Sequence, residues 1–171
     1  MNSFDRDRVF AVCRNYGPEL HVAQGLDGVR VALAIASNES SVGANCGPRH
    51  EPGYDVDGAI WRNSALQQKL VTEFGPAAAC SYGPWQMMFI NFEHGISPSD
   101  LLSDLDLCAR NFVKFFNGYV IATRKAVSLG DIGQVWNAGH VRAIPSPDVE
   151  RYCEHLATAY AQFAAAKREE R

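Results

Sequence analysis

The sequence has no C-x-x-C pair, no apolar run as long as a membrane span and no excess of positive charge. Its five cysteines lack the spacing of a zinc finger, and we expect neither a metal site nor a cofactor. A membrane span needs about 20 apolar residues, and the start MNSFDRDRVFAV has charges where a secretory signal would be apolar. We therefore expect a chain made in the cytoplasm without a signal peptide and without stable membrane insertion.

The overall balance of residue types is that of an ordinary globular domain. The chain has 171 residues, of which 47% are hydrophobic and 20% are charged, and this argues against disorder. Its formal net charge of −3 gives no reason to expect a nucleic-acid partner. No repeat and no low-complexity linker divides the sequence. We expect a single domain and a monomer.

Apolar residues recur at helical spacing along most of the chain and predict a mostly α-helical fold with little β structure. Proline, glycine and N-capping residues set the expected helix boundaries. The predicted helices cover residues 4–16, 27–41, 59–74, 97–127 and 131–139, and a last helix begins at Ser146-Pro147. We expect 1–27 to be an N-terminal helical extension, 28–165 the main domain and 166–171 a solvated tail.

Glu39 stands out near the end of the predicted helix 27–41. Ala32, Ile35 and Ala36 precede it at helical spacing, so the four side chains share one face. The run SSVGANCGP that follows cannot extend the helix far. A carboxyl on an apolar face beside a backbone break is placed to line a cleft, where desolvation raises its pKa as a general acid requires. A partly buried glutamate that caps a helix or forms an ion pair is the alternative interpretation.

The irregular stretch 43–58 follows Glu39 and contains further carboxylates. Long loops in a compact domain are more often functional than not. Asp55 and Asp57 are candidates for a second carboxylate facing Glu39, although Asp57 is also a plausible helix cap. Glu51 and Glu73 are available as well.

Three short motifs occur along the chain in a recognisable order. Glu39-Ser40 closes the alanine-rich helix, and the later motifs are SYGPWQM at 81–87 and WNAG at 136–139, with Tyr152 near the start of the last helix. This order resembles the soluble lytic transglycosylase and goose-type lysozyme families, whose patterns are E-S, S-x-G-x-x-Q-[ML] and [YW]-N-A-G. The resemblance covers residues 28–155. Trp136, where most members have tyrosine, and the insertion CGPRHEPGYD depart from the pattern.

The resemblance implies a lysozyme-like helical fold with a substrate cleft, and cleavage of the β-1,4 bond between N-acetylmuramic acid and N-acetylglucosamine. Glu39 would protonate the leaving oxygen and, in a transglycosylase, would then take the proton of the muramoyl 6-hydroxyl to close a 1,6-anhydro ring. An inverting hydrolase would need a second carboxylate such as Asp55 or Asp57. The residues expected in the sugar-binding groove are Ser40, Tyr54, Ser81, Gly83, Trp85, Gln86, Met87, Trp136 and Asn137.

The partner that the resemblance implies is the glycan strand of peptidoglycan. Together with the missing signal peptide, this suggests a phage or prophage lytic enzyme that acts on the bacterial cell wall. A virion enzyme and a secretion-system accessory enzyme are the other expected settings.

Two other classes of protein stay open from the sequence. Cys46 or Cys80 could be a thiol nucleophile with His140 as its base, as in a papain-like cell-wall peptidase or amidase. The same two cysteines could instead form a disulfide, because both lie in predicted loops. The other class is a non-catalytic glycan-binding domain on the same fold.

Overall fold

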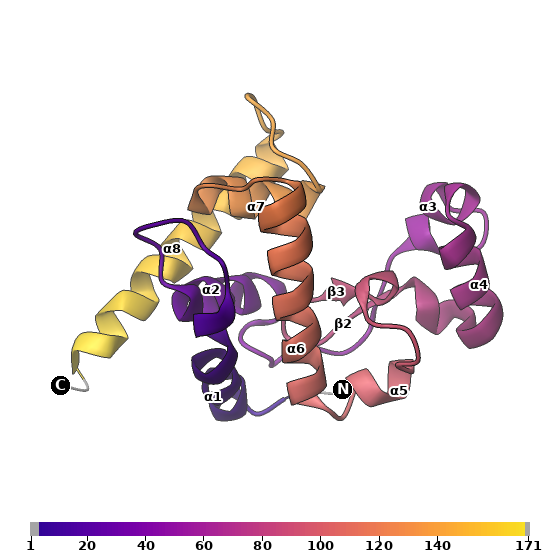
Figure 1. Cartoon of the computed structure of the whole chain (residues 1–171), viewed down its shortest axis with the longest axis horizontal. Helices are drawn as coiled ribbons and strands as arrows, with labels where there is room; N and C mark the ends of the chain where they lie inside the picture. Colours follow the sequence, from indigo (N-terminus) through magenta and orange to yellow (C-terminus); the bar gives the residue numbers. More distant parts are fainter. Residues whose placement is uncertain (1–3, 170–171) are drawn as a thin grey trace.

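Helices make up most of the fold, as predicted, and Figure 1 shows their arrangement. The computed structural model describes residues 4–169, so residues 1–3 of the expected extension and 170–171 of the expected tail lie outside it. The α-helices are α1 (Arg6–Tyr16), α2 (Gly28–Ser40), α3 (Ala59–Asn63), α4 (Ala65–Phe74), α5 (Pro98–Leu101), α6 (Leu105–Phe115), α7 (Leu129–Ala138) and α8 (Pro147–Glu169). The other helical segments are η1 (Gly17–Glu19), η2 (Pro52–Tyr54), η3 (Gly75–Ala79), η4 (Phe89–Asn91) and the π-helix η5 (Phe116–Thr123).

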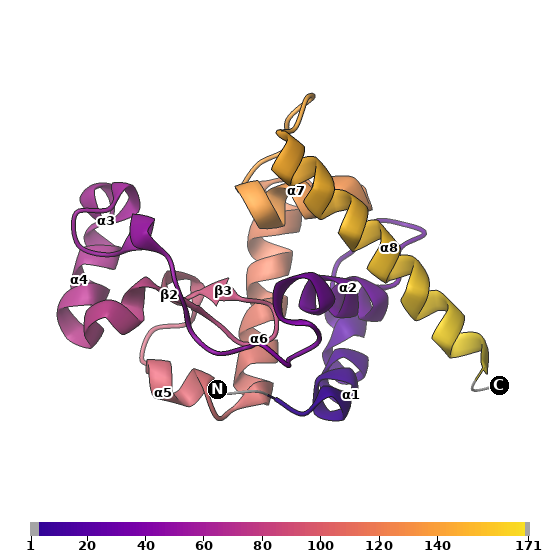
Figure 2. The same ribbon diagram turned by 180° about the vertical axis from the view of Figure 1, so that it is seen from behind.

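Helix α2 lies at the centre of the fold and is not an amphipathic helix on its surface. Every side chain from Val31 to Ala36 is buried, on all sides of the helix. A helix that is apolar all round has to be surrounded, and α1, η1 and α8 pack against it, with α8 passing across it in Figure 2. The Asp27 side chain caps its start, and Ser41 ends it in a left-handed conformation with φ 52°. The predicted bounds of this helix are therefore confirmed.

The N-terminal segment belongs to the same core as α2. Val9, Val12 and Cys13 of α1 are buried, and they join one hydrophobic cluster with residues of α2 and α6. Asp5 caps α1 by accepting a hydrogen bond from the Asp7 N–H. Helix α1 is therefore part of the central packing and not an appendage to it.

The predicted helix 97–127 is a succession of three helical segments. Helix α5 makes one turn, Asp104 caps α6 by accepting a hydrogen bond from the Leu107 N–H, and the chain continues beyond α6 as the π-helix η5. A π segment changes the direction of the side chains that follow it, and such segments are frequent at functional sites. The apolar side chains buried along α6 and η5 include Leu105, Cys108, Phe112, Phe116 and Val120.

The predicted helix 59–74 is broken at Ser64. This residue is extended, with φ −131° and ψ 106°, and its side chain caps α4 by accepting a hydrogen bond from the Gln67 N–H. Gln67 is itself buried, and its amide donates to the carbonyls of Tyr54 at 2.7 Å and Ala78 at 3.0 Å. In Figure 1 the α3–α4 pair stands apart from α6 and α7. Gln67 ties this pair to the turn that carries Tyr54.

A small antiparallel sheet includes residues 80–82 and 87–88, in the segment 80–92 whose sequence fits either a short strand or a loop. Its strands β1 (Arg49–His50), β2 (Cys80–Tyr82) and β3 (Met87–Met88) are arranged in the order β1-β2-β3. Arg49 pairs with Ser81 across the first two strands. Strands of two or three residues are too short to show the alternation that marks a strand in a sequence. The sheet fixes the backbone of Arg49 beside the motif at 81–87.

Candidate active site

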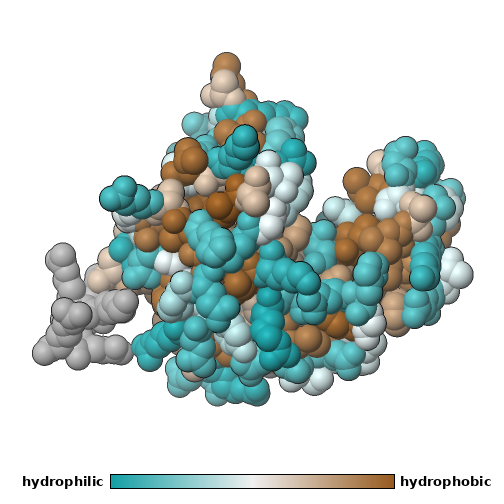
Figure 3. Space-filling view, viewed as in Figure 1, coloured by the Kyte–Doolittle hydropathy of each residue, from teal (hydrophilic) through white to brown (hydrophobic). Residues whose placement is uncertain are grey.

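One cleft collects residues from separate parts of the fold. It has a volume of about 640 Å³ and lies among the end of α2, the β1–η2 segment, β3 and η4, η5, α7 and Tyr152 of α8. Figure 3 shows the molecular surface hollowed between the α3–α4 pair and the body that contains α6 and α7. Among the residues predicted for the site, those that line the cleft are Glu39, Tyr54, Gln86, Met87, Trp136 and Asn137.

Glu39 lies in the last turn of α2 with 10% of its side chain exposed. Its Oε1 accepts a hydrogen bond from the Tyr152 hydroxyl at 2.8 Å. Its Oε2 lies 3.5 Å from the Nη1 of Arg49. The two oxygens are therefore held from two elements, α8 and β1, and this fixes the orientation of the carboxyl group.

Burial is the largest influence on the Glu39 carboxyl and raises its pKa above the ordinary glutamate value. The hydrogen bond from Tyr152 and the positive charge of Arg49 favour the ionised form and lower the pKa in part, whereas the negative charge of Glu51 raises it. The net direction is upward, as the sequence predicted. A carboxyl with a raised pKa stays protonated closer to neutral pH, which a general acid requires.

Gln86 lines the cleft, but its amide is bonded inside the protein. Its Oε1 accepts from the Ser81 hydroxyl at 2.9 Å, and its Nε2 donates to the carbonyls of Gly83 at 3.1 Å and Gly47 at 3.3 Å. Its backbone is left-handed with φ 47°, a conformation that costs a non-glycine residue free energy. Gln86 thus holds the cleft wall together.

Ser40, Ser81 and Gly83 lie behind the cleft wall, which corrects their expected place in the groove. The two serines are 2% and 1% exposed. The Ser40 hydroxyl donates to the carbonyl of Pro84 at 2.7 Å and accepts from the Gly43 N–H at 2.9 Å. The E-S motif therefore joins the end of α2 to the motif at 81–87. These residues support the cleft and do not line it.

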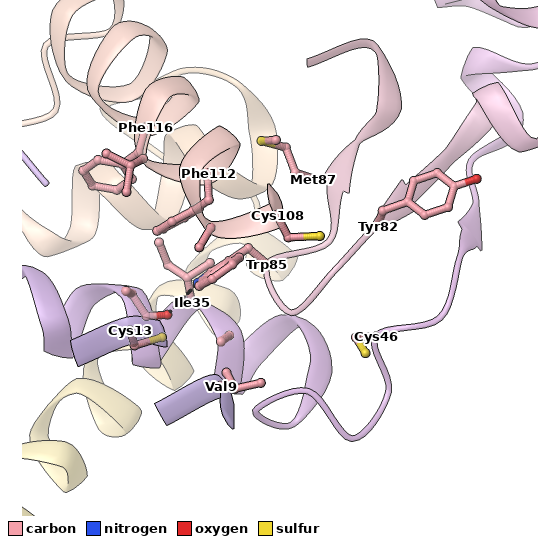
Figure 4. Close-up of a cluster of buried hydrophobic side chains, with 14 of the residues drawn as sticks. Val9, Cys13, Ile35, Cys46, Tyr82, Trp85, Met87, Cys108, Phe112 and Phe116 are labelled. Carbon is pink, nitrogen blue, oxygen red and sulfur yellow. Dashed lines mark hydrogen bonds between the residues drawn. The ribbon is translucent and has the colours of Figure 1, made fainter. Parts of the chain in front are cut away.

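Trp85 is a core residue, which corrects its expected place beside the sugars. It is 2% exposed, and its ring stacks on Phe112 with 4.4 Å between ring centroids and 9° between ring planes. Its Nε1 donates to the carbonyl of Ala32 at 3.0 Å. Figure 4 shows Trp85 among buried side chains that include Ile35 and Phe112. The ring is therefore not available to a ligand in the cleft.

Trp136, Asn137 and Tyr54 are the predicted contact residues that the cleft leaves accessible. Trp136 is partly buried, and its ring meets Phe115 edge to face at a centroid distance of 5.8 Å. Asn137 is exposed near the end of α7, where Gly139 ends the helix with φ 79° as predicted. Tyr54 is partly buried on η2. Aromatic faces and an amide on a cleft wall suit a ligand that is apolar on its ring faces and polar at its edges.

The two acidic residues predicted for a hydrolase do not line the cleft. Asp55 pairs with His50, with 2.8 Å between Oδ2 and Nε2, and Asp57 is exposed in a turn with φ 65°. Glu51 lines the cleft instead, and its Oε1 accepts a hydrogen bond from the Nε of Arg49 at 2.8 Å. Glu51 is therefore the second carboxylate of the cleft.

For the cell-wall lysis that the sequence leads us to expect, Asp55→Asn and Asp57→Asn should each lower the rate less than about tenfold, below the usual effect of losing an acid or base. Asp55 bonds to His50 outside the cleft, and Asp57 does not cap α3, whose N-cap is Gly58. The rate of turbidity loss of purified cell walls measures the effect. A folded variant of either residue whose lytic rate fell by roughly 10²–10⁴-fold would contradict this prediction.

Several cleft residues carry little signal in the sequence. Asn38 directly precedes Glu39 and donates from Nδ2 to the Tyr152 carbonyl at 3.1 Å, so its place on α2 could have indicated it. Tyr119 donates from its hydroxyl to the Gly139 carbonyl at 3.1 Å, which ties η5 to the end of α7. Its direction depends on the π-helix, which no sequence pattern predicted. Arg49 lies in the insertion that departs from the family pattern.

The five cysteines are thiols, so the bridge between Cys46 and Cys80 that the sequence left open is not formed. Burial raises the pKa of each thiol, to about 12 for Cys13 and for Cys108. A thiol is a nucleophile only as the thiolate, which a raised pKa disfavours.

His140, the base considered for a thiol peptidase, hydrogen-bonds through its ring to the side chain of Arg142. The Sγ of Cys80 donates to the carbonyl of Pro76. Within the part of the chain that the structure describes, the cleft lining contains neither cysteine nor histidine. The geometry therefore gives the thiol mechanism no support.

Comparisons with protein-family models, with curated proteins and with solved structures found no match to this chain. Among residues 4–169, no group of three or more histidine, cysteine, aspartate or glutamate side chains is arranged to hold a metal ion. Across the same residues, no helix combines the length and the apolar character that a membrane span requires.

Proposed function

We propose that the chain cleaves the β-1,4 bond between N-acetylmuramic acid and N-acetylglucosamine in peptidoglycan, as a lytic transglycosylase with a lysozyme-like fold. One observation carries the proposal: a cleft contains a nearly buried carboxyl, Glu39, whose pKa is raised and whose orientation is fixed by Tyr152 and Arg49. Glu39 is also the glutamate of the E-S pair in the motif order that resembles the lytic transglycosylases.

Glu39 acts twice in this reaction. As an acid it gives its proton to the glycosidic oxygen while the bond from that oxygen to the muramoyl C1 breaks, and the N-acetylglucosamine end leaves as an alcohol. As a carboxylate it then takes the proton of the muramoyl 6-hydroxyl, whose oxygen bonds to C1 and closes the 1,6-anhydro ring. No water is consumed, and Glu39 ends protonated as it began. A single carboxyl is therefore sufficient for the chemistry.

The walls of the cleft offer the groups that a glycan strand requires. Trp136 and Tyr54 present aromatic rings, and Asn38, Asn91 and Asn137 present amides that donate and accept hydrogen bonds. N-acetyl sugars expose apolar ring faces together with hydroxyl and amide edges. The lining thus supports a saccharide substrate in preference to a strongly charged one.

An inverting muramidase is the second candidate, because Glu51 lines the same cleft as Glu39. Such an enzyme needs a base carboxylate about 6.5–9.5 Å from the acid, with a water between them. Glu51 would take a proton from that water as the water oxygen bonds to C1. However, one oxygen of Glu51 already accepts a hydrogen bond from Arg49. This engagement favours the transglycosylase.

Mass spectrometry of the muropeptides released from purified cell walls tests the proposal. A transglycosylase releases muramoyl ends that are lighter by one water than the reducing ends left by a hydrolase. Release of reducing ends alone would make the enzyme a muramidase. Binding to the walls without release of any fragment would exclude both and identify a non-catalytic glycan-binding domain.

The proposed activity suits bacteriolysis by a phage or prophage. An endolysin reaches the wall through a lesion in the membrane, and a virion enzyme reaches it from outside. An accessory enzyme of a bacterial secretion system would need the same chemistry to open a local gap in the wall.

A further inference from the structure

Arg49 connects the two carboxylates of the cleft. Its Nε lies 2.8 Å from Glu51 Oε1, and its Nη1 lies 3.5 Å from Glu39 Oε2. Its backbone is held in the sheet by pairing with Ser81, whose side chain is buried. A guanidinium has several donors in a rigid plane, so it can engage two carboxylates at once, which a lysine ammonium does less well.

In this bridge of Arg49 to Glu39 and Glu51, the Arg49 end is exposed to solvent and the Glu39 end is nearly buried. The Arg49 side chain is 54% exposed, and the Glu39 side chain is 10% exposed. The other groups that influence the charge of Glu39 are Tyr152 from α8 and Glu51 from the segment after β1. The part of α7 that lines the cleft adds no titratable side chain, and the remaining titratable side chains of the lining are Tyr54 and Tyr119.

We propose that Arg49 is a positioning residue that bridges Glu39 and Glu51 and so reserves proton transfer for Glu39. The inference rests on the proposed function. When Glu39 has given its proton away, a carboxylate is left in a nearly buried place, and such a charge is costly unless it is paired. Arg49 and Tyr152 pair it until the 6-hydroxyl returns a proton.

The same bridge keeps Glu51 from assisting hydrolysis. If Glu51 is released from Arg49, hydrolysis can compete with closure of the anhydro ring. In that route Glu39 protonates the leaving oxygen, the oxygen of a water bonds to C1, and Glu51 takes the proton of that water. The product is then a reducing end, and Glu39 and Glu51 return to their starting states by exchanging protons with solvent. The ratio of anhydro ends to reducing ends therefore reports what Arg49 does.

Changes at Arg49 and Glu51 should shift the pH profile of kcat/KM in opposite directions. The informative part is the basic limb, where kcat/KM falls as the pH rises. Glu39 must start protonated, so kcat/KM falls as the pH rises through the pKa of this carboxyl. Arg49→Gln removes a positive charge that lowers this pKa, so the basic limb should move to higher pH. Glu51→Gln removes a negative charge that raises the pKa of Glu39, and Glu39 is then the only carboxylate beside Arg49. Its basic limb should move to lower pH.

The experiment compares Arg49→Gln and Glu51→Gln with Arg62→Gln, a control at an exposed arginine of α3 outside the cleft. Purified cell walls are digested by each folded variant, products are identified by mass spectrometry, and the pH dependence of kcat/KM is recorded. Arg49→Gln is expected to raise the fraction of reducing ends at least about tenfold and to move the basic limb of the pH profile to higher pH. Glu51→Gln is expected to keep the anhydro product.

Arg49→Lys separates the bridge from the charge. A lysine keeps the positive charge, so the basic limb should stay near that of the wild type, but one ammonium should not restrain both carboxylates. Reducing ends should therefore still increase. Full restoration of the wild-type product ratio by lysine would overturn the bridging role.

The outcomes also separate this inference from the proposed function. An active wild type with anhydro products, together with an Arg49→Gln variant that matches Arg62→Gln in product ratio and basic limb, overturns the inference alone. A wild type that releases no fragments overturns the proposed function and, with it, the role of Arg49. A wild type that releases only reducing ends overturns the reserved role of Glu39.

Discussion

Glu39→Gln is expected to reduce the rate of cell-wall lysis by a factor of at least about 10²–10⁴, the usual contribution of general acid–base catalysis. The amide has nearly the same shape as the carboxyl, but it neither gives a proton to the glycosidic oxygen nor takes one from the 6-hydroxyl. Its carbonyl oxygen can still accept the hydrogen bond from Tyr152. The loss should therefore fall on kcat, measured as turbidity loss at saturating wall concentration.

The stability of the Glu39→Gln variant should show that the loss is chemical. Because the folded-state pKa of Glu39 is raised, the folded protein binds this proton more tightly than the unfolded chain does. The contribution of Glu39 to the free energy of unfolding is thus largest at low pH. It decreases as the pH rises from the ordinary value of 4.5 through the raised pKa. Near neutral pH the glutamine variant should be at least as stable as the wild type.

Glu73→Gln is a matched control for Glu39→Gln, because Glu73 is an exposed carboxylate on α4 that lies outside the cleft. Its lytic rate should equal that of the wild type. If Glu39→Gln kept more than about a tenth of the wild-type rate with normal stability, Glu39 would not be the catalytic acid.

Trp85→Ala is expected to lower the free energy of unfolding by about 3–5 kcal/mol, the range for removal of a large buried aromatic side chain. The change removes the stack on Phe112 and the hydrogen bond from Nε1 to Ala32, and it leaves a cavity between α2 and α6. Urea denaturation followed by circular dichroism measures the loss. A loss below about 1 kcal/mol would contradict the place of this ring in the core.

Trp85→Phe distinguishes packing from hydrogen bonding at the same position. A phenyl ring can keep the stack on Phe112 but has no donor for the Ala32 carbonyl. Its destabilisation should be smaller than that of the alanine variant. Trp85 lies directly before Gln86 of the cleft wall, so the alanine variant should also lose lytic activity below its unfolding midpoint.

The helix ends that could be predicted from the sequence are those where one residue decides the outcome locally. The Asp27 cap, the left-handed Gly139 and the Ser146-Pro147 start each act within a single turn, so their chemistry can be read without the rest of the fold. The break at Ser64 has an equally local cause, because the Ser64 side chain caps α4. The apolar spacing continues across 59–74, so the sequence predicted one helix there.

The candidate site was predictable where it depends on α2 and not where it depends on packing between distant segments. The helical face of Glu39 follows from spacing alone, and the structure places this side chain in a cleft. Trp85 and Trp136 are equally aromatic in the sequence, yet the first is buried against Phe112 and the second lines the cleft. That difference arises from how the 81–87 segment meets α6, which no local pattern encodes. In the sequence, Glu51 is only one of four candidates for a second carboxylate. In the structure, the sheet places Arg49 beside it and the two side chains form a hydrogen bond.

The burial of the cysteines has a consequence for how the folded chain responds to oxidants. Thiols attack oxidants and disulfides as thiolates, and a group with a pKa of about 12 is ionised in roughly one molecule in 10⁵ at pH 7. All five cysteines have a raised pKa. Disulfides between copies of the folded chain should therefore form more slowly than from thiols of ordinary pKa, with the partly buried Cys153 the most accessible of the five.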